Sequence, residues 1–181
     1  KDHAPRPWYG IGQSTGGAIL MDFLLSGGED IFTKTVLLAP LVRPDRWWLS
    51  RTAHSIGKLF LKHVQRNFAI NSHDEQFLAF IEHKDPLQSS VLPVQWVTAL
   101  KRWLKHFMSM QGIIYVPLVI QGREDKTVDW QYNMPVVKQK FKDARFFYIA
   151  NGRHQLVNES EDIRRVMFSA MDVYFDVYSR E

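Results

Sequence analysis

Residues 12–16 read Gly-Gln-Ser-Thr-Gly, a G-x-S-x-G pattern that suits a serine nucleophile. In such a pattern the serine stands on a strained turn between a strand and a helix, which lifts its hydroxyl clear of the sheet. We expect glycine at Gly12 and Gly16 because bulk two positions either side of the serine would collide with the neighbouring strand and helix. A glycine-rich helix start, N-capped by Ser14, is the alternative. The apolar run before the pattern and the helical pattern after it favour the nucleophile.

A serine nucleophile needs a base, and the chain has seven histidines. His3 precedes the serine, and five others stand in a helical stretch, mostly beside charged residues as solvated histidines do: His54, His63, His73, His83 and His106. His154 instead follows the last predicted strand, at the carboxyl end where α/β sheets place ligands. The sequence therefore predicts His154 as the base, with a plain loop histidine as the alternative.

The base needs an orienting acid, which we expect at the end of the preceding strand. The segment from Gly122 to Asp129 offers three carboxylates there. Asp125 stands three residues after the glycine that ends the strand, so the turn can aim it towards His154. Glu124 and Asp129 are the alternatives, and we interpret them as solvated loop charges or a helix cap.

The start of the helix after Ser14 supplies partial positive charge and unpaired N–H groups. We therefore expect the Thr15 N–H to be one donor to an oxyanion. Such a mechanism requires no metal and no organic cofactor. The chain contains no cysteine, which excludes disulfides and thiolate metal sites and leaves Ser14 as the nucleophile that a motif supports.

Short apolar runs predict four strands, and helical periodicity predicts helices between and after them. The expected strands are Pro7–Ile11, Thr35–Ala39, Val116–Gln121 and Ala144–Ala150, and the helices cover 18–25, 130–142 and 158–178. Continuous apolar runs are typical of parallel strands buried on both faces. The fold class is therefore predicted to be α/β, with a parallel sheet flanked by helices.

The stretch between the second and third strands is too long for a plain connection. Three amphipathic helices are expected in it, over 53–68, 74–83 and 93–110. We therefore predict a first core segment over 1–42, a helical cap or lid over 43–112, and a second core segment over 113–181 with the acid, the base and the last helix.

Composition is that of a globular protein, with 181 residues of which 45% are hydrophobic and 23% charged. The longest uncharged apolar runs are too short for a transmembrane helix. The net charge of +4 is a mild excess without a run of consecutive basic residues, so nucleic acid is not expected as a partner.

Three segments carry a resemblance to a known family: residues 12–17, 117–128 and 152–159. The chain resembles α/β-hydrolases grouped with monoacylglycerol lipases and bacterial lysophospholipases. That resemblance implies nucleophile, acid and base at Ser14, Asp125 and His154, and a helical cap between two core strands. It also implies about four more strands before the predicted strand Pro7–Ile11, and a second oxyanion donor in the turn after the third of them. We therefore expect these residues to be the C-terminal part of a longer polypeptide, or to pair with a separate N-terminal chain.

The implied activity is hydrolysis of lipid-type esters through an acyl-enzyme. A thioesterase or acyltransferase with the same three residues, a peptidase, and a non-catalytic ligand-binding protein stay open. The expected cap carries many apolar side chains, which could line an acyl-chain pocket or simply pack on the core. Its lysines and arginine could face an anionic membrane or solvent: Lys58, Lys62, Lys101, Arg102 and Lys105. We expect a cytoplasmic or inner-membrane-associated location.

Overall fold

The central sheet has four parallel strands in the order β1-β2-β5-β6. The computed structural model describes residues 6–48, 63–65, 68–87 and 89–176. The strands are β1 (Tyr9–Gln13), β2 (Lys34–Leu38), β5 (Leu118–Gly122) and β6 (Arg145–Ile149). All four predicted strands are thus present, with ends shifted by at most two residues. The α/β class with a parallel sheet is confirmed.

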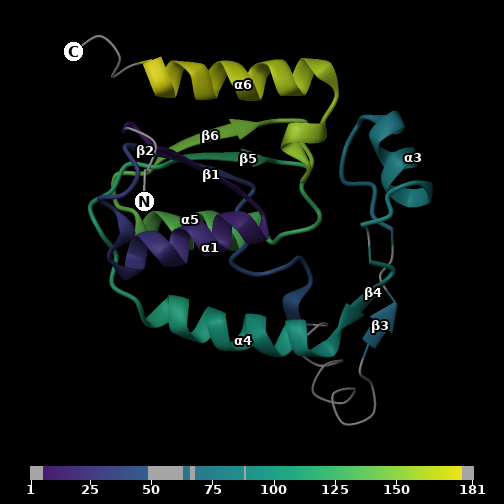
Figure 1. Ribbon diagram of the computed structural model, residues 1–181, viewed down its shortest axis with the longest axis horizontal. Coiled ribbons are helices and arrows are strands. Elements are labelled where there is room, and N and C mark those ends of the chain that lie inside the picture. The colour runs from purple at the N-terminus through teal and green to yellow at the C-terminus, as the bar shows by residue number, and fades with distance from the viewer. Residues whose placement is uncertain (1–5, 49–62, 66–67, 88, 177–181) are drawn as a thin grey trace.

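The sheet is the middle of three layers (Figure 1). Helix α6 (Glu161–Asp176) covers one face, and α1 (Thr15–Phe23) and α5 (Trp130–Lys140) cover the other. A short π-helix, Leu24–Gly28, continues α1. Strands β2 and β5 are buried along their whole length because helices cover both of their faces, whereas β1 and β6 are half exposed.

Alternation along β2 and β5 builds two hydrophobic clusters. Leu38 and Ile120 face α6 and pack with its Met167. Leu37 and Val119 point to the opposite face, towards α1 and α5. Period-2 alternation therefore divides one apolar run between the two cores.

Four elements are described between β2 and β5. They are β3 (His63–Gln65), α3 (Glu75–His83), β4 (Val91–Pro93) and α4 (Val94–Ser109). The helices predicted over 74–83 and 93–110 are confirmed. The helix predicted over 53–68 is wrong at residues 63–65, which instead pair antiparallel with β4, and residues 49–62 and 66–67 lie outside the described ones. The boundaries of the cap stay a prediction.

Helix α4 packs on the core through its apolar stripe. Phe107 is fully buried in the cluster that contains α1 and α5, and Trp103 Nε1 donates to Asp22 Oδ1 of α1 at 2.9 Å. Lys140 of α5 donates to the carbonyls of Met108 and Met110 at the end of α4, and its burial lowers the pKa of this amine. For α4, the apolar stripe therefore serves packing.

Other apolar side chains of the predicted cap stay exposed, among them Trp48 and Phe80. Within the described ranges, no helix combines the length and the apolar character that crossing a membrane requires.

Candidate active site

Ser14 occupies a strained turn between β1 and α1. Its φ of 52° lies in the left-handed region that L side chains rarely adopt, at a cost of about 1–3 kcal/mol. Two backbone hydrogen bonds hold the turn, because the Ser14 N–H donates to Leu38 O at 2.9 Å and its carbonyl accepts from Leu41 N at 3.0 Å. The geometry is that of a nucleophile elbow, and the side chain is only partly buried.

The two glycines of the motif differ in what surrounds them. A Cβ at Gly12 would lie 2.6 Å from the carbonyl oxygen of Gly16, so glycine is required there. A Cβ at Gly16 would meet nothing within 4 Å, so the expected collision is wrong for this position in this structure. The crowded glycine of the helix start is Gly17, where a Cβ would lie 3.1 Å from Pro40. Gly16 lines an open hollow beside β1 instead.

The structure brings the three predicted side chains together in a row. His154 Nε2 lies 2.9 Å from Ser14 Oγ, and His154 Nδ1 lies 2.8 Å from Asp125 Oδ2. Each residue follows the carboxyl end of a strand: Ser14 after β1, Asp125 after β5 and His154 after β6. His154 is 3% exposed and Asp125 6%, so solvent screens their interaction little.

Both carboxylate oxygens of Asp125, in the turn after β5, accept hydrogen bonds. Its Oδ1 accepts from Thr127 N at 2.8 Å and Val128 N at 3.1 Å, and its Oδ2 accepts from Gln121 Nε2 at 3.1 Å in addition to His154. Four hydrogen bonds therefore fix the carboxylate and aim it at Nδ1. An ionised Asp125 makes Nδ1 the donor and leaves Nε2 free to accept from a hydroxyl.

The two alternative carboxylates, Asp129 and Glu124, make other contacts. Asp129 N-caps α5 by accepting from Tyr132 N at 3.1 Å, and it pairs with Arg43 at 2.6 Å. Glu124 is half exposed, and its Oε2 lies 3.7 Å from His73 Nε2. The interpretation of Asp129 as a helix cap is confirmed.

A close approach of two glycines joins the turn of Asp125 to the loop of His154. A Cβ on Gly122 would lie 2.2 Å from the carbonyl oxygen of Gly152. That carbonyl also accepts from Glu124 N at 2.9 Å. The spacing between Asp125 and His154 therefore depends on glycine at position 122, which has no Cβ.

Sequence reasoning missed the polar contacts that link the loops around the site. Gln13 Nε2 donates to Gln155 Oε1 at 2.7 Å, which joins the neighbours of Ser14 and His154. Glu159 is fully buried close to His154 and accepts hydrogen bonds from the backbone of its own segment, at Arg153 and Ser160, and from the distant His73. Glu159 lies in the segment 152–159 that carries the resemblance, but nothing in the sequence marks its contact with His73.

Thr15 is the first residue of α1, so its N–H is among those that the helix itself leaves unpaired. It therefore stands where the sequence predicts an oxyanion donor. In the part of the chain that the structure describes, no cluster of three histidine, aspartate or glutamate side chains is arranged to hold a metal ion.

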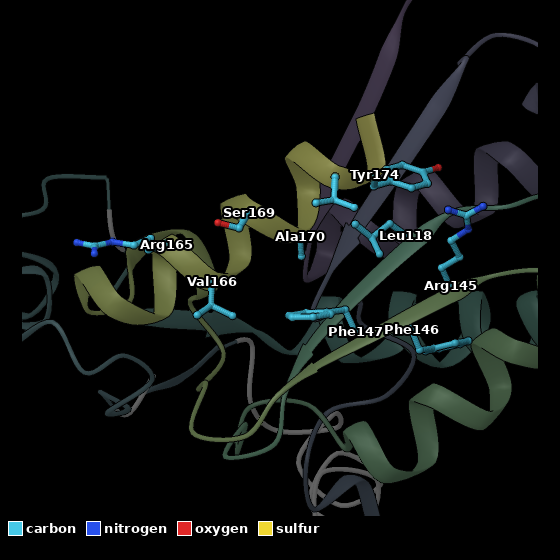
Figure 2. Close-up of a pocket in the computed structure, with 10 residues that line it drawn as sticks. Leu118, Arg145, Phe146, Phe147, Arg165, Val166, Ser169, Ala170 and Tyr174 are labelled. Atoms are coloured by element: carbon cyan, nitrogen blue, oxygen red, sulfur yellow. The ribbon is translucent and has the colours of Figure 1, made fainter. Parts of the chain in front are cut away.

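A separate apolar groove of about 600 Å³ runs between β6 and α6. Figure 2 shows Phe147 and Ala170 along it, with Arg145 and Arg165 at opposite ends. Ser14, Asp125 and His154 do not line this groove, so it is distinct from the candidate active site.

Comparisons with known proteins agree with this architecture. The family model described as serine aminopeptidase, S33, matches residues 1–161. A soluble variant of monoglyceride lipase from Saccharomyces cerevisiae, solved with a substrate analogue, aligns with a TM-score of 0.77 at 14% identity, covering 94% of this chain and 65% of that one. For the monoacylglycerol lipase of Paleococcus ferrophilus the TM-score is 0.73 at 13% identity, with coverages of 91% and 66%.

An esterase from Exiguobacterium antarcticum aligns with a TM-score of 0.59 at 14% identity, covering 91% of this chain and 65% of that one. The comparison with curated proteins gave no significant match. At these identities the solved structures show the fold, which is that of the α/β-hydrolases. The chain spans about two-thirds of the length of each of these three solved structures.

Proposed function

The chain belongs to the serine aminopeptidase S33 family of α/β-hydrolases, and from that membership we propose that it is a serine hydrolase of lipid-type carboxylic esters. The observation that carries the proposal is the row of hydrogen bonds from Ser14 Oγ through His154 to Asp125. Monoacylglycerols and lysophospholipids are the proposed substrate class. Both follow from the resemblance, and the names of two similar structures agree with monoacylglycerols.

In the proposed mechanism, Ser14 Oγ attacks the ester carbonyl while its proton passes to His154 Nε2. The C–O bond to the alcohol then breaks, and the alcohol leaves with that proton. Water repeats the sequence on the acyl-enzyme and releases the fatty acid. Asp125 holds the imidazole in the required tautomer and stabilises the positive charge it acquires.

The Thr15 N–H is the proposed donor to the oxyanion, at the positive end of α1. We propose that a further segment of the fold supplies the second donor. Removal of one such donor from a serine hydrolase costs about a hundredfold or more in kcat, so activity should depend on that segment.

The surface beside β1 supports a further segment at this edge. Tyr9 and Ile11 of β1 and Ile19 of α1 are about half or more exposed. Together with Gly16 they line a hollow of about 490 Å³ along the unpaired edge of β1. Such an edge is ordinarily covered or paired in a native protein. The proposed occupant is an N-terminal part of the fold, on the same polypeptide or on a companion chain.

The proposed membrane contact rests on the segment between β2 and β5. That segment contains exposed Trp48 and Phe80 and the basic residues Arg102 and Lys105. A segment with both exposed apolar side chains and cations suits the surface of an anionic bilayer. A peripheral contact would bring the site to lipid substrates, in a cytoplasmic or inner-membrane-associated protein.

The test combines covalent labelling with a substrate panel on the full-length protein. We expect a fluorophosphonate probe to modify Ser14 in the wild type and not in Ser14→Ala. The panel compares p-nitrophenyl esters of rising chain length, lysophospholipids, monoacylglycerols and an aminoacyl p-nitroanilide, and lipid esters should be hydrolysed fastest. A folded wild type without an adduct on Ser14 would contradict the proposal and leave a ligand-binding protein.

Two alternative enzymes share the acyl-enzyme and differ in the acyl acceptor or the acyl donor. An acyltransferase would form more glycerol ester than free acid when glycerol is added, and a thioesterase would prefer acyl thioesters to the matched oxygen esters. A preference for the aminoacyl p-nitroanilide would favour a peptidase, as the family description suggests.

A further inference from the structure

Glu159 is a carboxylate with no exposed surface, and it stands five residues after the proposed base. Burial of a charge is costly unless donors replace the lost water. Here three backbone N–H groups point at it, from Arg153 at 2.7 Å, His73 at 2.7 Å and Ser160 at 3.2 Å. The carboxylate therefore joins two segments that lie far apart in the sequence, residue 73 and residues 153–160.

The two oxygens of Glu159 hold different segments. Oε1 accepts from Arg153 N, the residue directly before His154. Oε2 accepts from His73 N, in the segment that leads into α3, and from Ser160 N at the start of α6. The His73 imidazole adds a contact, with Nδ1 3.1 Å from Oε2 and 3.3 Å from Oε1. Its Nε2 faces Glu124, the neighbour of Asp125.

Further hydrogen bonds join the same two segments. Arg153 Nη1 donates to Ser72 O at 2.7 Å, and Ser72 Oγ donates to Asn158 O at 2.6 Å. Gln155 N donates to Asn71 O at 2.9 Å. The backbone on both sides of His154 is thus tied to residues 71–73, which belong to the stretch between β2 and β5 rather than to the sheet.

We propose that Glu159 is a positioning residue for His154, and that it makes residues 71–73 a fixed support of the candidate active site. Its carboxylate clamps the loop of His154 to this support, so that Nε2 stays in line with Ser14 Oγ and Nδ1 with Asp125. The kinetic part of this inference rests on the proposed function. The structural part, the orientation of the imidazole, does not.

Glu159→Gln separates this role from a simple need for bulk. Glutamine has nearly the shape of glutamate, but only one of its two terminal atoms accepts hydrogen bonds. If its oxygen keeps Arg153 N, its NH₂ faces the N–H groups of His73 and Ser160, and the reverse placement abandons Arg153 N. Either way one segment is released, and a misplacement of about 1 Å at a reacting group can cost a hundredfold in rate.

The experiment uses the full-length wild type, Glu159→Gln and the control Glu161→Gln, whose carboxylate lies exposed against Arg165 on the same segment. At a temperature where all three are folded, we expect kcat of Glu159→Gln to fall by at least about tenfold with KM changed by less than about threefold. In ¹⁵N-histidine NMR, the Nδ1–H resonance of His154 should shift or broaden in Glu159→Gln and stay unchanged in Glu161→Gln.

His73→Ala provides a second variant, which keeps the test valid if Glu159→Gln does not fold. It removes the imidazole and leaves the His73 main-chain N–H on Glu159, so we expect a smaller loss of kcat and a smaller change of the His154 resonance. The proposal is overturned if Glu159→Gln, or His73→Ala in its place, has both kcat and the His154 resonance of the wild type. Should the wild type show no reaction at Ser14, the proposed function fails, and the resonance alone decides on Glu159.

Discussion

The turn after β5 fixes the orientation of the Asp125 carboxylate. The Thr127 and Val128 N–H groups bind one carboxylate oxygen, and Gln121 Nε2 shares the other with His154 Nδ1. The oxygen that faces the imidazole therefore cannot rotate away without abandoning two backbone donors. The free energy needed to orient this carboxylate is spent when the protein folds, so no reorganisation is needed during the reaction.

Asp125→Asn should remove most of the activity and leave the fold intact. The backbone N–H groups of Thr127 and Val128 will hold the amide oxygen in place, so the NH₂ group will face His154 Nδ1. Nδ1 must then accept a hydrogen bond, so the imidazole proton moves to Nε2. A protonated Nε2 cannot take the proton from Ser14 Oγ. By analogy with the matching change in serine proteases, we expect kcat to fall by about 10⁴.

The measurement is kcat per mole of folded protein, with circular dichroism to confirm the fold. Glu124→Gln is the matched control, because Glu124 stands next in the sequence, is half exposed and faces His73. Its kcat should stay within about threefold of the wild type, since exposed ion pairs contribute little. Equal losses of kcat in Asp125→Asn and Glu124→Gln would contradict the role proposed for Asp125.

Residue types in chain order were enough to predict Ser14, Asp125 and His154, because the G-x-S-x-G pattern and two strand ends limit where the partners can stand. They were not enough for Glu159 and His73. These two residues meet only because the stretch after β2 returns to the sheet across 86 positions. A single sequence carries no pattern for such a tertiary contact.

At the scale of elements, the site depends on how two loops approach each other above β5 and β6. Glycine at Gly122 and Gly152 lets the backbones touch, and Arg123 N and Glu124 N donate to the carbonyls of Ile149 and Gly152. The Asp125 carboxylate and the His154 imidazole, carried by these two loops, lie 2.8 Å apart.

Gly122→Ala should therefore damage both stability and catalysis. The new Cβ would lie 2.2 Å from a backbone oxygen, which cannot rotate away as a side chain can. Overpacking in a core typically costs about 1–3 kcal/mol, and we expect a loss of at least about 3 kcal/mol here because the obstacle is backbone. Activity should fall further than the folded fraction does, because the acid and the base move apart.

Urea unfolding followed by fluorescence measures the loss of stability, and kcat per mole of folded protein measures the catalytic effect. Gly10→Ala is the control, since its Cβ would lie 3.3 Å from the ring of Phe32, a side chain that can shift. A smaller loss of stability in Gly122→Ala than in Gly10→Ala would contradict the role given to the glycine contact.

Several of the elements that were predicted carry a clear apolar pattern in their own sequence. Strands β2 and β5 are continuous apolar runs, and α4 has an apolar stripe. Strands β3 and β4 have three residues each and largely exposed side chains, so neither length nor alternation marks them. The steric reason given for Gly16 was wrong because it assumed a neighbour that the structure does not contain beside it.

At the scale of the whole molecule, the two edges of the sheet are open in different ways. Beyond β6 lies the groove under α6, and beside β1 lies the hollow lined by Ile11, Gly16 and Ile19. The sequence predicted the four strands of this sheet from their apolar runs, and it predicted further strands before them only through a family resemblance. The exposed apolar residues along β1 are an independent physical reason for that second prediction.

Ile19→Lys tests whether the edge of β1 is covered in the native protein. Ile19 is 67% exposed here, so a lysine should be harmless if this surface meets only solvent. If an N-terminal part of the fold packs there, the lysine is buried without a partner and should lower the free energy of unfolding by at least about 2 kcal/mol. We expect that loss in the protein isolated at its native length, with a fall in activity as the second oxyanion donor shifts.

Val173→Lys is the matched control, because Val173 is also an apolar helix residue, is 65% exposed and stands at the opposite edge of the sheet. It should change neither the urea midpoint nor kcat by more than a small fraction of the effect of Ile19→Lys. Equal and small effects of the two lysines would mean that the edge of β1 stays open to solvent. The second oxyanion donor would then have to come from a segment that does not pack against this edge.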